Sequence, residues 1–242
     1  MTLSLRGGNK TLYKIKKNYR PIFLHLFKEI ASKSALFDKL YAEKEFSPFA
    51  SSVYFGNNFK VLKDGFQFSS PIQLFFSTGQ FDLYAHFING CLDFKNNSET
   101  INIDKETELF VEDIFPIQPE KVSSHEISIK TMSPIVVQNP DASKEDFNNF
   151  YLTPNDSYFQ EIINIITQKR MHHHETDGFT PITIKTVKSR DEYVYHYGGY
   201  VKASSGIFNL KASKETLQFL YDYGIGNRTG QLFGLFKMHS RR

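Results

Sequence analysis

The sequence predicts an α+β fold in which a β-α-β-β-α-β order of elements occurs twice. Four helical patterns, with apolar residues three to four positions apart, alternate with short β-rich apolar runs. The order read in the first half returns in the second. Two such units in tandem indicate two ferredoxin-like (RRM-like) domains, which we assign to residues 1–120 and 121–242.

The first unit begins with a loosely alternating strand over residues 1–17, interrupted by a turn at Gly7-Gly8. A helical pattern follows from Tyr19 to about Glu43, and Pro21 suits its first turn. Ser47-Pro48 then ends the helix. The remaining predicted elements are strands over 49–60 and 66–77, a helix over 81–91, and strands over 100–103 and 109–117.

The second unit begins with a strand over residues 125–137. A helix over 157–171 follows, with Asn155 or Asp156 as its cap. Two strands, over 180–188 and 193–209, surround a turn or bulge at Gly198-Gly199. A helix over 214–223 and a strand over 232–238 complete the unit.

Charge is distributed unevenly along the chain. The formal net charge is +3, of which residues 1–33 supply +7 and residues 201–242 supply +5, so the residues between them carry −9. Two basic ends around an acidic middle predict a surface for a polyanion built from both termini. The alternative is that these charges only solvate the faces of terminal elements.

The composition limits the class of protein. No apolar run approaches the roughly 20 residues that a membrane span needs, and the N-terminal residues lack the apolar core of a signal peptide. The single cysteine, Cys91, excludes an internal disulfide framework. We therefore expect a cytoplasmic protein that does not associate with a membrane. We expect Cys91 to pack in the core.

A glycine-rich block, Gly224 to Met238, closes the chain between the last helix and the last strand. Glycines allow positive φ and close approach to a ligand, and free backbone N–H groups in such a loop bind anions. Arg228 and Thr229 make a phosphate the natural ligand. Because the loop follows a helix, it is not a Walker or Rossmann loop. A glycine C-cap followed by a hairpin is the structural alternative.

Three segments resemble one known family. Gly224-Ile-Gly226, five residues, and then Leu232-Phe233-Gly234-Leu235-Phe236 are similar to the glycine-rich loop of the RAMP superfamily of CRISPR-associated proteins. Leu232 stands where that family usually has glycine. Met132 to Val137 and the run from Phe46 to Gly56 resemble strands of the repeat-cleaving CRISPR endoribonucleases.

The resemblance implies tandem ferredoxin-like domains that bind CRISPR repeat RNA and cut a precursor transcript once per repeat. The implied reaction is attack by the ribose 2′-OH, without metal or cofactor, which leaves a 2′,3′-cyclic phosphate. Other CRISPR effector subunits are implied as partners, and some relatives form homodimers. The alternatives are a non-catalytic RNA-binding RAMP subunit of an effector complex and a ferredoxin-like module with no RNA role.

The family's usual catalytic histidine, near the end of the first helix, is replaced by tyrosine in the pair Leu40-Tyr41. Three residues of the first helix region are the substitutes. His25 has an ordinary pKa suited to proton transfer, Tyr41 needs a cation to lower its pKa, and Lys44 could stabilise phosphate charge. The alternative for His25 and Tyr41 is simple packing.

The expected RNA-binding residues come from the two basic ends of the chain: Lys17, Arg20, Gly224, Gly226, Asn227, Arg228, Thr229, Gly234 and Lys237. The run His172-His173-His174 is not expected to bind metal, because adjacent residues on a helix point in different directions.

Overall fold

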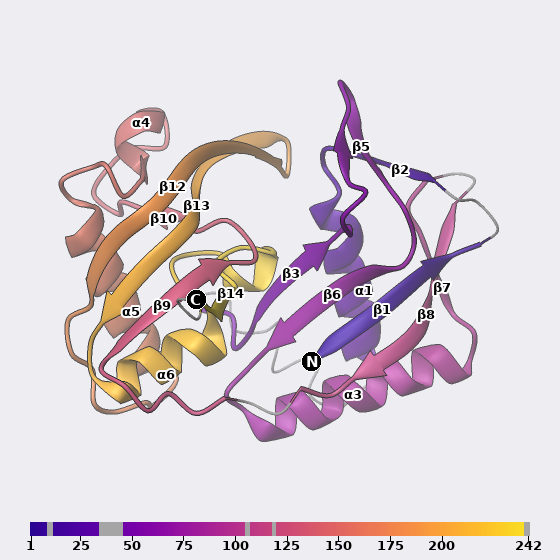
Figure 1. The fold of residues 1–242 in the computed structure, drawn as a ribbon, viewed down its shortest axis with the longest axis horizontal. Coiled ribbons are helices and arrows are strands. Elements are labelled where there is room, and N and C mark those ends of the chain that lie inside the picture. The colour runs from indigo at the N-terminus through magenta and orange to yellow at the C-terminus, as the bar shows by residue number, and fades with distance from the viewer. Residues whose placement is uncertain (9–11, 34–45, 105–106, 118–119, 240–242) are drawn as a thin grey trace.

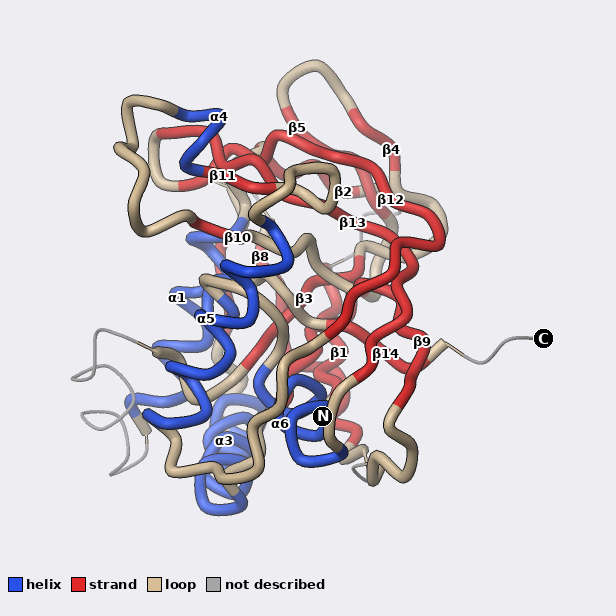
Figure 2. Tube along the Cα trace, turned by 90° about the vertical axis from the view of Figure 1, so that its left-hand side faces the viewer, coloured by secondary structure: helices blue, strands red, loops and turns tan. Residues whose placement is uncertain are grey.

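The computed structural model describes residues 1–8, 12–33, 46–104, 107–117 and 120–239. It is a mixed α+β structure with two main β-sheets side by side (Figure 1). Seen from the side, the helices gather on one side of the molecule and the strands on the other (Figure 2). Both sheets therefore leave one face free of helices.

The N-terminal sheet has five strands in the order β3 (Ala50–Tyr54), β6 (Ile72–Ser77), β1 (Thr2–Gly7), β8 (Glu108–Phe115) and β7 (Thr100–Asn102). Helices α1 (Arg20–Ser32) and α3 (Phe81–Asn96) pack on it. A smaller sheet joins β2 (Tyr13–Lys16), β5 (Gly65–Phe68) and β4 (Lys60–Val61).

The N-terminal core forms because strand alternation and helix periodicity bury the same apolar set. On β1, Leu3 and Leu5 are fully buried, as is Phe23 on α1. Phe76 of β6 stacks on Phe87 of α3 with ring centroids 4.2 Å apart. The alternate residues of these strands therefore face away from the helices.

The C-terminal sheet has the order β12 (Thr183–His196), β13 (Gly199–Lys211), β9 (Glu126–Thr131) and β14 (Phe236–Met238). Helices α5 (Phe159–His173) and α6 (Lys214–Tyr223) bury their apolar faces against it. Smaller elements are β10 (Val137–Gln138), β11 (Tyr151–Leu152), α4 (Phe147–Phe150) and a 3₁₀ turn, η1 (Thr229–Gln231).

Four strands of each sheet have the same arrangement: β3-β6-β1-β8 in the N-terminal sheet and β12-β13-β9-β14 in the C-terminal sheet. Within each set, the strands lie in the spatial order second, third, first, fourth, and β7 is an extra edge strand in the N-terminal sheet.

The two halves meet where β3 passes the segment before β14. Ser51 forms a parallel bridge with Gly234. Ser52 Oγ donates to the Met132 carbonyl at 2.7 Å, and Ser133 Oγ donates to the Ser51 carbonyl at 3.3 Å. Backbone and side-chain hydrogen bonds therefore tie the edge of one half to the glycine-rich block of the other.

Several element predictions need correction. The strand expected over 66–77 is two strands, because Pro71 has no N–H to donate and interrupts the run. The strand expected over 125–137 ends at Thr131, just before Ser133-Pro134, and resumes at Val137. The last strand begins at Phe236 rather than Leu232.

Two further differences concern helices. The helix expected to reach Glu43 is described from Arg20 to Ser32, and residues 34–45 lie outside the described residues. Helix α6 matches its predicted bounds. No helix in the described part of the chain has both the length and the hydropathy that a membrane span requires.

Candidate nucleic-acid interface

The glycine-rich block is a buried turn between α6 and β14. Gly224, Gly226 and Gly234 have φ values of +77°, +83° and +69°, which only glycine adopts readily. Backbone carbonyl oxygens of other residues also lie close to two of these glycines. A Cβ on Gly226 would stand 2.4 Å from the Val136 carbonyl oxygen, and one on Gly234 would stand 2.1 Å from that of Ile225.

Three N–H groups of this block are occupied by other backbone groups. Ile225 N donates to Gly234 O at 2.9 Å, Asn227 N to Val136 O at 2.7 Å, and Gly234 N to Pro134 O at 2.8 Å. The first of these bonds closes the block on itself, and the other two hold it against Pro134 and Val136. The N–H groups of Ile225, Asn227 and Gly234 are therefore not open to an anion, and Gly226 and Gly234 allow close packing of the backbone.

Arg170 of α5 holds this turn by hydrogen bonds, although no sequence pattern marks it as functional. Its guanidinium donates to the carbonyls of Gly224 (2.8 Å), Gly226 (3.2 Å) and Tyr223 (2.6 Å), and to Thr229 Oγ1 at 3.3 Å. Arg170 is 2% exposed. Burial lowers its pKa to about 10, and no described carboxylate forms an ion pair with it. Backbone carbonyls thus take the place of a counterion.

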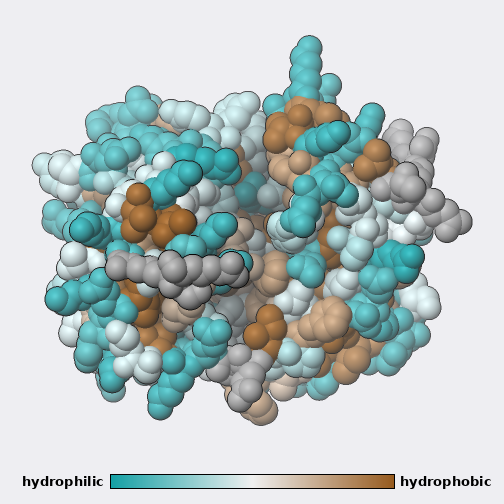
Figure 3. All heavy atoms as spheres, in the orientation of Figure 1, coloured by the Kyte–Doolittle hydropathy of each residue, from teal (hydrophilic) through white to brown (hydrophobic). Residues whose placement is uncertain are grey.

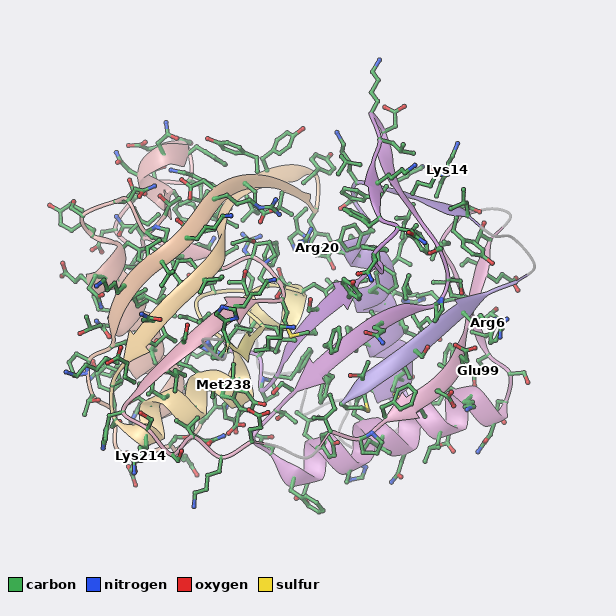
Figure 4. All side chains as sticks on the ribbon, viewed as in Figure 1. Arg6, Lys14, Arg20, Glu99, Lys214 and Met238 are labelled. Carbon is green, nitrogen blue, oxygen red and sulfur yellow. The ribbon has the colours of Figure 1, made fainter. Side chains whose placement is uncertain are left out.

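Arg20 secures the same block from the other half of the molecule. Its Nε lies 3.5 Å from the Leu232 carbonyl, and its guanidinium carbon lies 4.6 Å from the centroid of the Phe233 ring. The side chain lies between the two halves (Figure 4) and the residue is 5% exposed. The guanidinium of Arg20 therefore joins the two halves, and its contact with RNA stays a prediction.

Two other predicted RNA contacts are also engaged within the fold. Asn227 Oδ1 accepts from the backbone N–H of Gln138 at 2.8 Å. Thr229 is 3% exposed and its hydroxyl accepts from Arg170. Both side chains shape the turn, and Arg228, in left-handed conformation at φ +60°, remains partly exposed beside them.

A histidine adjoins Arg228 that sequence reasoning did not single out. His196, at the end of β12, places Nε2 3.0 Å from Gln231 Oε1. Burial lowers its pKa, the Gln231 hydrogen bond acts against this, and the charges of Arg20 and Arg228 lower it further. Its Nδ1 is buried and has no partner among the described residues. Arg228 Nη2 lies 3.4 Å from the Tyr151 hydroxyl.

The face of the C-terminal sheet opposite its helices carries a row of lysines. Ile129 and Phe208 face the helices, so the alternate residues Lys130 and Ile207 face the other way. Lys188 pairs with Ile207, Ile207 with Lys130, and Lys130 with Lys237. The register thus sets three lysines in one line across the four strands.

We name this face the basic face and define it by six exposed cations: Lys130, Lys185, Lys188, Arg190, Lys211 and Lys237. Within the described part of the chain, none of them forms an ion pair with a carboxylate. Lys130 and Lys237 are direct cross-strand neighbours, and like charges in that position repel. A polyanion on this face would relieve the repulsion.

Of the three predicted catalytic residues the structure describes His25 alone, and it does not lie at the glycine-rich block. His25 is exposed, with Nε2 3.5 Å from Glu29 Oε1. It lines a cavity of about 420 Å³ with Phe94 and residues 100–102, at the edge of the sheet opposite β3. Tyr41 and Lys44 lie outside the described residues.

Two further predictions concern exposed and metal-binding groups. Lys17, between β2 and α1, is exposed and remains accessible to RNA. In the histidine run at the end of α5, His174 stacks on Tyr223 with ring centroids 4.8 Å apart. No group of three candidate metal ligands occurs among the described residues.

Comparison with known proteins finds similar sequences and similar solved structures. The family model "CRISPR associated protein Cas6, C-terminal" matches residues 117–238. A relative from Pyrococcus horikoshii, named a putative CRISPR-associated endoribonuclease-like protein Cas6nc, is 27% identical over 137 residues. That match spans only about half of each protein, 55% of this chain and 56% of the relative.

Two solved structures share the whole fold. A Cas6-related protein from Pyrococcus furiosus superposes with a TM-score of 0.86 at 20% identity and covers 100% of this chain and 99% of its own. A RAMP protein described as binding different RNA substrates gives 0.83 at 20% identity, with 99% and 98% covered. Since the family model spans just over half of the residues, the chain belongs to the Cas6 family of CRISPR-associated, endoribonuclease-like RAMP proteins.

Proposed function

We propose that this chain binds CRISPR repeat RNA on its basic face and cleaves it without a metal ion, as an endoribonuclease that processes precursor transcripts. The observation that carries the binding is the line Lys188, Lys130 and Lys237 across four strands, with no described carboxylate paired to it. Phosphate contacts of this kind supply most of the sequence-independent affinity for nucleic acid.

The architecture supports a tandem ferredoxin-like interpretation. Each sheet repeats the strand order second, third, first, fourth, with two helices on one face, as the β-α-β-β-α-β unit requires. We propose domains of residues 1–120 and 121–242. The helix-free faces of the two sheets lie on the same side of the molecule (Figure 2), which gives a single RNA strand one continuous platform.

Cleavage needs a group that removes the 2′-OH proton, a group that protonates the departing 5′ oxygen, and a cation near the phosphate. The products would be a 2′,3′-cyclic phosphate and a free 5′-OH. His25, Tyr41 and Lys44 are the proposed groups. His25 is solvent-exposed on α1 and lines a cavity with β7, at the opposite edge of the sheet from β3, which meets the glycine-rich block, so RNA on the basic face must continue around the molecule to reach it.

A non-catalytic RNA-binding RAMP subunit is the second candidate function. The specific observation in its favour is Leu40-Tyr41 where the family usually has its catalytic histidine. Such a subunit would act with other CRISPR effector proteins. It would use the same basic face, so the two candidates share a binding surface and differ only in whether the RNA is cut.

One cleavage assay separates these candidates. The protein is incubated with end-labelled repeat RNA in excess EDTA, beside a repeat with a 2′-deoxy nucleotide at the cut position. A single cut that the deoxy substitution blocks supports the endonuclease. Binding without a cut supports the second candidate. If His25→Ala and Tyr41→Phe both cut at the parent rate, the proposed catalytic groups are wrong.

A salt titration tests the basic face. Lys130→Glu with Lys237→Glu should weaken repeat binding and reduce the slope of log affinity against log salt by about 1.4, since each single-strand phosphate contact contributes about 0.7. The matched control reverses Lys169 and Lys214, exposed residues on α5 and α6. An equal loss in both double variants would contradict a specific role for the basic face.

A further inference from the structure

The helix-free face of the N-terminal sheet carries exposed phenylalanines. In β8, both neighbours of Phe110 are buried in the core, so Phe110 points to the opposite face. Phe115 lies opposite Thr2 of β1, and the next residue of β1, Leu3, faces the helices. Phe115 therefore shares the face of Phe110, because directly opposed residues in a sheet point the same way. Phe110 is 38% exposed and Phe115 is 50% exposed.

The strand register carries this surface to the boundary between the halves. Thr2 also lies opposite Phe75 of β6, and Phe75 lies opposite Ser52 of β3. One line across four strands, with neighbours about 5 Å apart, therefore contains Ser52, Phe75, Thr2 and Phe115. We name Phe75, Phe110 and Phe115 the aromatic face. Figure 3 looks onto this side of the molecule, where apolar atoms gather in the lower part of the N-terminal half.

The three rings have no aromatic partner within the described part of the chain. Phe76, the residue after Phe75, points into the core and stacks on Phe87. In contrast, the members of the aromatic face belong to none of the buried clusters and to none of the ring contacts between described residues. Their ring surfaces are therefore available to a flat ligand.

The aromatic face begins where the lysine row of the basic face ends. A cleft of about 770 Å³ lies between the two halves, and Gln218 and Asp222 of α6 form part of its lining. Phe75 lines this cleft from the N-terminal sheet, and Lys237 lines it from the C-terminal sheet. Lys237 is also the last member of the lysine row, opposite Lys130. An RNA strand whose phosphates follow that row therefore reaches the aromatic face by crossing the cleft.

The charges around the aromatic face favour bases over phosphates. Arg6 is the cross-strand neighbour of Phe110, and its guanidinium pairs with the Glu112 carboxylate at 3.0 Å. Asp113 of the same strand pairs with Lys95 of α3 at 3.2 Å. Because these cations are already neutralised, they attract a phosphate less than the lysine row does. Uncharged bases, in contrast, stack on aromatic rings largely without regard to sequence.

We propose that the aromatic face stacks unpaired bases of the same RNA strand whose phosphates bind the basic face. The proposal rests on the proposed RNA-binding function and divides it between the halves: the C-terminal sheet holds the backbone, and the N-terminal sheet holds bases. Aromatic side chains on the open face of a four-stranded sheet stack two or three bases in other RNA-binding modules. Stacking of this kind adds affinity for single-stranded RNA without selecting a sequence.

The test measures binding of two fluorescent probes by anisotropy over a series of salt concentrations. One probe is a ten-nucleotide oligoadenosine RNA, and the other is a ribose-phosphate strand of equal length and charge without bases. The parent should bind the oligoadenosine more tightly. The double variant Phe110→Ala with Phe115→Ala should bind the oligoadenosine at least about 25-fold more weakly, about fivefold for each ring. Its affinity for the abasic strand and its slope of log affinity against log salt should stay unchanged.

Two controls accompany the double variant. Tyr158→Ala removes an aromatic ring that is 64% exposed at the start of α5 and should bind both probes as the parent does. Phe115→Tyr keeps the ring and should also bind as the parent does, whereas Phe115→Leu keeps an apolar side chain and should lose affinity for the oligoadenosine.

The outcomes separate the stacking proposal from the proposed function. If the double variant binds the oligoadenosine as tightly as the parent, the aromatic face serves another occupant, such as the apolar surface of a protein, and stacking is overturned. An equal loss for the abasic strand, or equal affinity of the parent for both probes, also overturns stacking alone. If neither probe binds the parent in a salt-dependent way, both the stacking proposal and the proposed function are overturned.

Discussion

Asp222 should make the protein less stable at neutral pH than in mild acid, and replacement with asparagine should remove that dependence. The carboxyl group is partly buried at the cleft, with Gln218 as its only described hydrogen-bond donor. Burial raises its pKa from 3.8 to about 6, and the Gln218 hydrogen bond opposes part of that rise. The ionised form is therefore disfavoured in the folded state.

The direction of the pH dependence follows from comparing the pKa of Asp222 in the folded and the unfolded chain. The unfolded chain releases the Asp222 proton near pH 3.8, and the folded chain releases it near pH 6. Between these values the folded state binds more protons, so stability falls as pH rises and then levels off above about pH 6. The full shift corresponds to about 3 kcal/mol, and we expect about 1.5–2 kcal/mol because water reaches part of the carboxyl group.

The pH dependence is measured by urea unfolding of the parent and of Asp222→Asn at several pH values between 4 and 8. The variant should match the parent near pH 4 and exceed its free energy of unfolding by about 1.5–2 kcal/mol above pH 6.5. The exposed Asp141→Asn variant should show no such divergence. A variant that is less stable than the parent at pH 7.5, or whose difference does not change with pH, would refute the reasoning.

Three further predictions concern the core. Arg170→Met strands three backbone carbonyls and should cost about 3 kcal/mol or more in urea unfolding, with Arg170→Lys intermediate. Gly226→Ala should destabilise more than Gly56→Ala, because both have φ above +80° but only Gly226 faces an atom, Val136 O, at 2.4 Å; equal losses would contradict the packing role. Cys91, whose pKa burial raises to about 12, should resist thiol reagents at pH 8 until the protein unfolds.

Local patterns in the sequence predicted the bounds of α6, whereas α5 is capped by Tyr158 and not by Asn155 or Asp156. Ser213 caps α6 by accepting from Thr216 N, and the helix ends at Gly224 with φ +77°, both of which are local signals. The breaks at Pro71 and at Ser133-Pro134 are local signals too, but the apolar runs around them concealed the interruption. Helix α4 has only four residues, too few for a periodicity to show.

The function of the glycine-rich block depends on contacts that no local pattern records. Its glycines do adopt positive φ, as expected. Whether its N–H groups are open to a ligand is decided by Val136 and Pro134, and its carbonyls are taken by Arg170, which lies 54 positions before Gly224. Sequence reasoning could not weigh the packing alternative against anion binding without these partners.

The basic face was hidden for a different reason. In a regular strand, residues three apart such as Lys185 and Lys188 point to opposite faces. The register shift between Thr186 and Lys188 inserts an extra residue, and such a bulge returns both lysines to the same face. Strict alternation along the sequence therefore assigns Lys185 and Lys188 to opposite faces of the sheet, although the bulge places them on the same face.

The buried guanidinium of Arg170 sets an order of events during synthesis. This side chain leaves the ribosome more than 50 residues ahead of the carbonyls that receive it, and a charged group without acceptors is costly to bury. Helix α5 must therefore keep that end solvated until the last residues emerge. Those same residues close the edge strand β3 through the Ser51–Gly234 bridge. A nascent chain that stops before residue 224 would have a guanidinium without its carbonyl acceptors and a sheet edge without its bridge to Gly234. The turn at residues 224–234 therefore completes the packing of both halves.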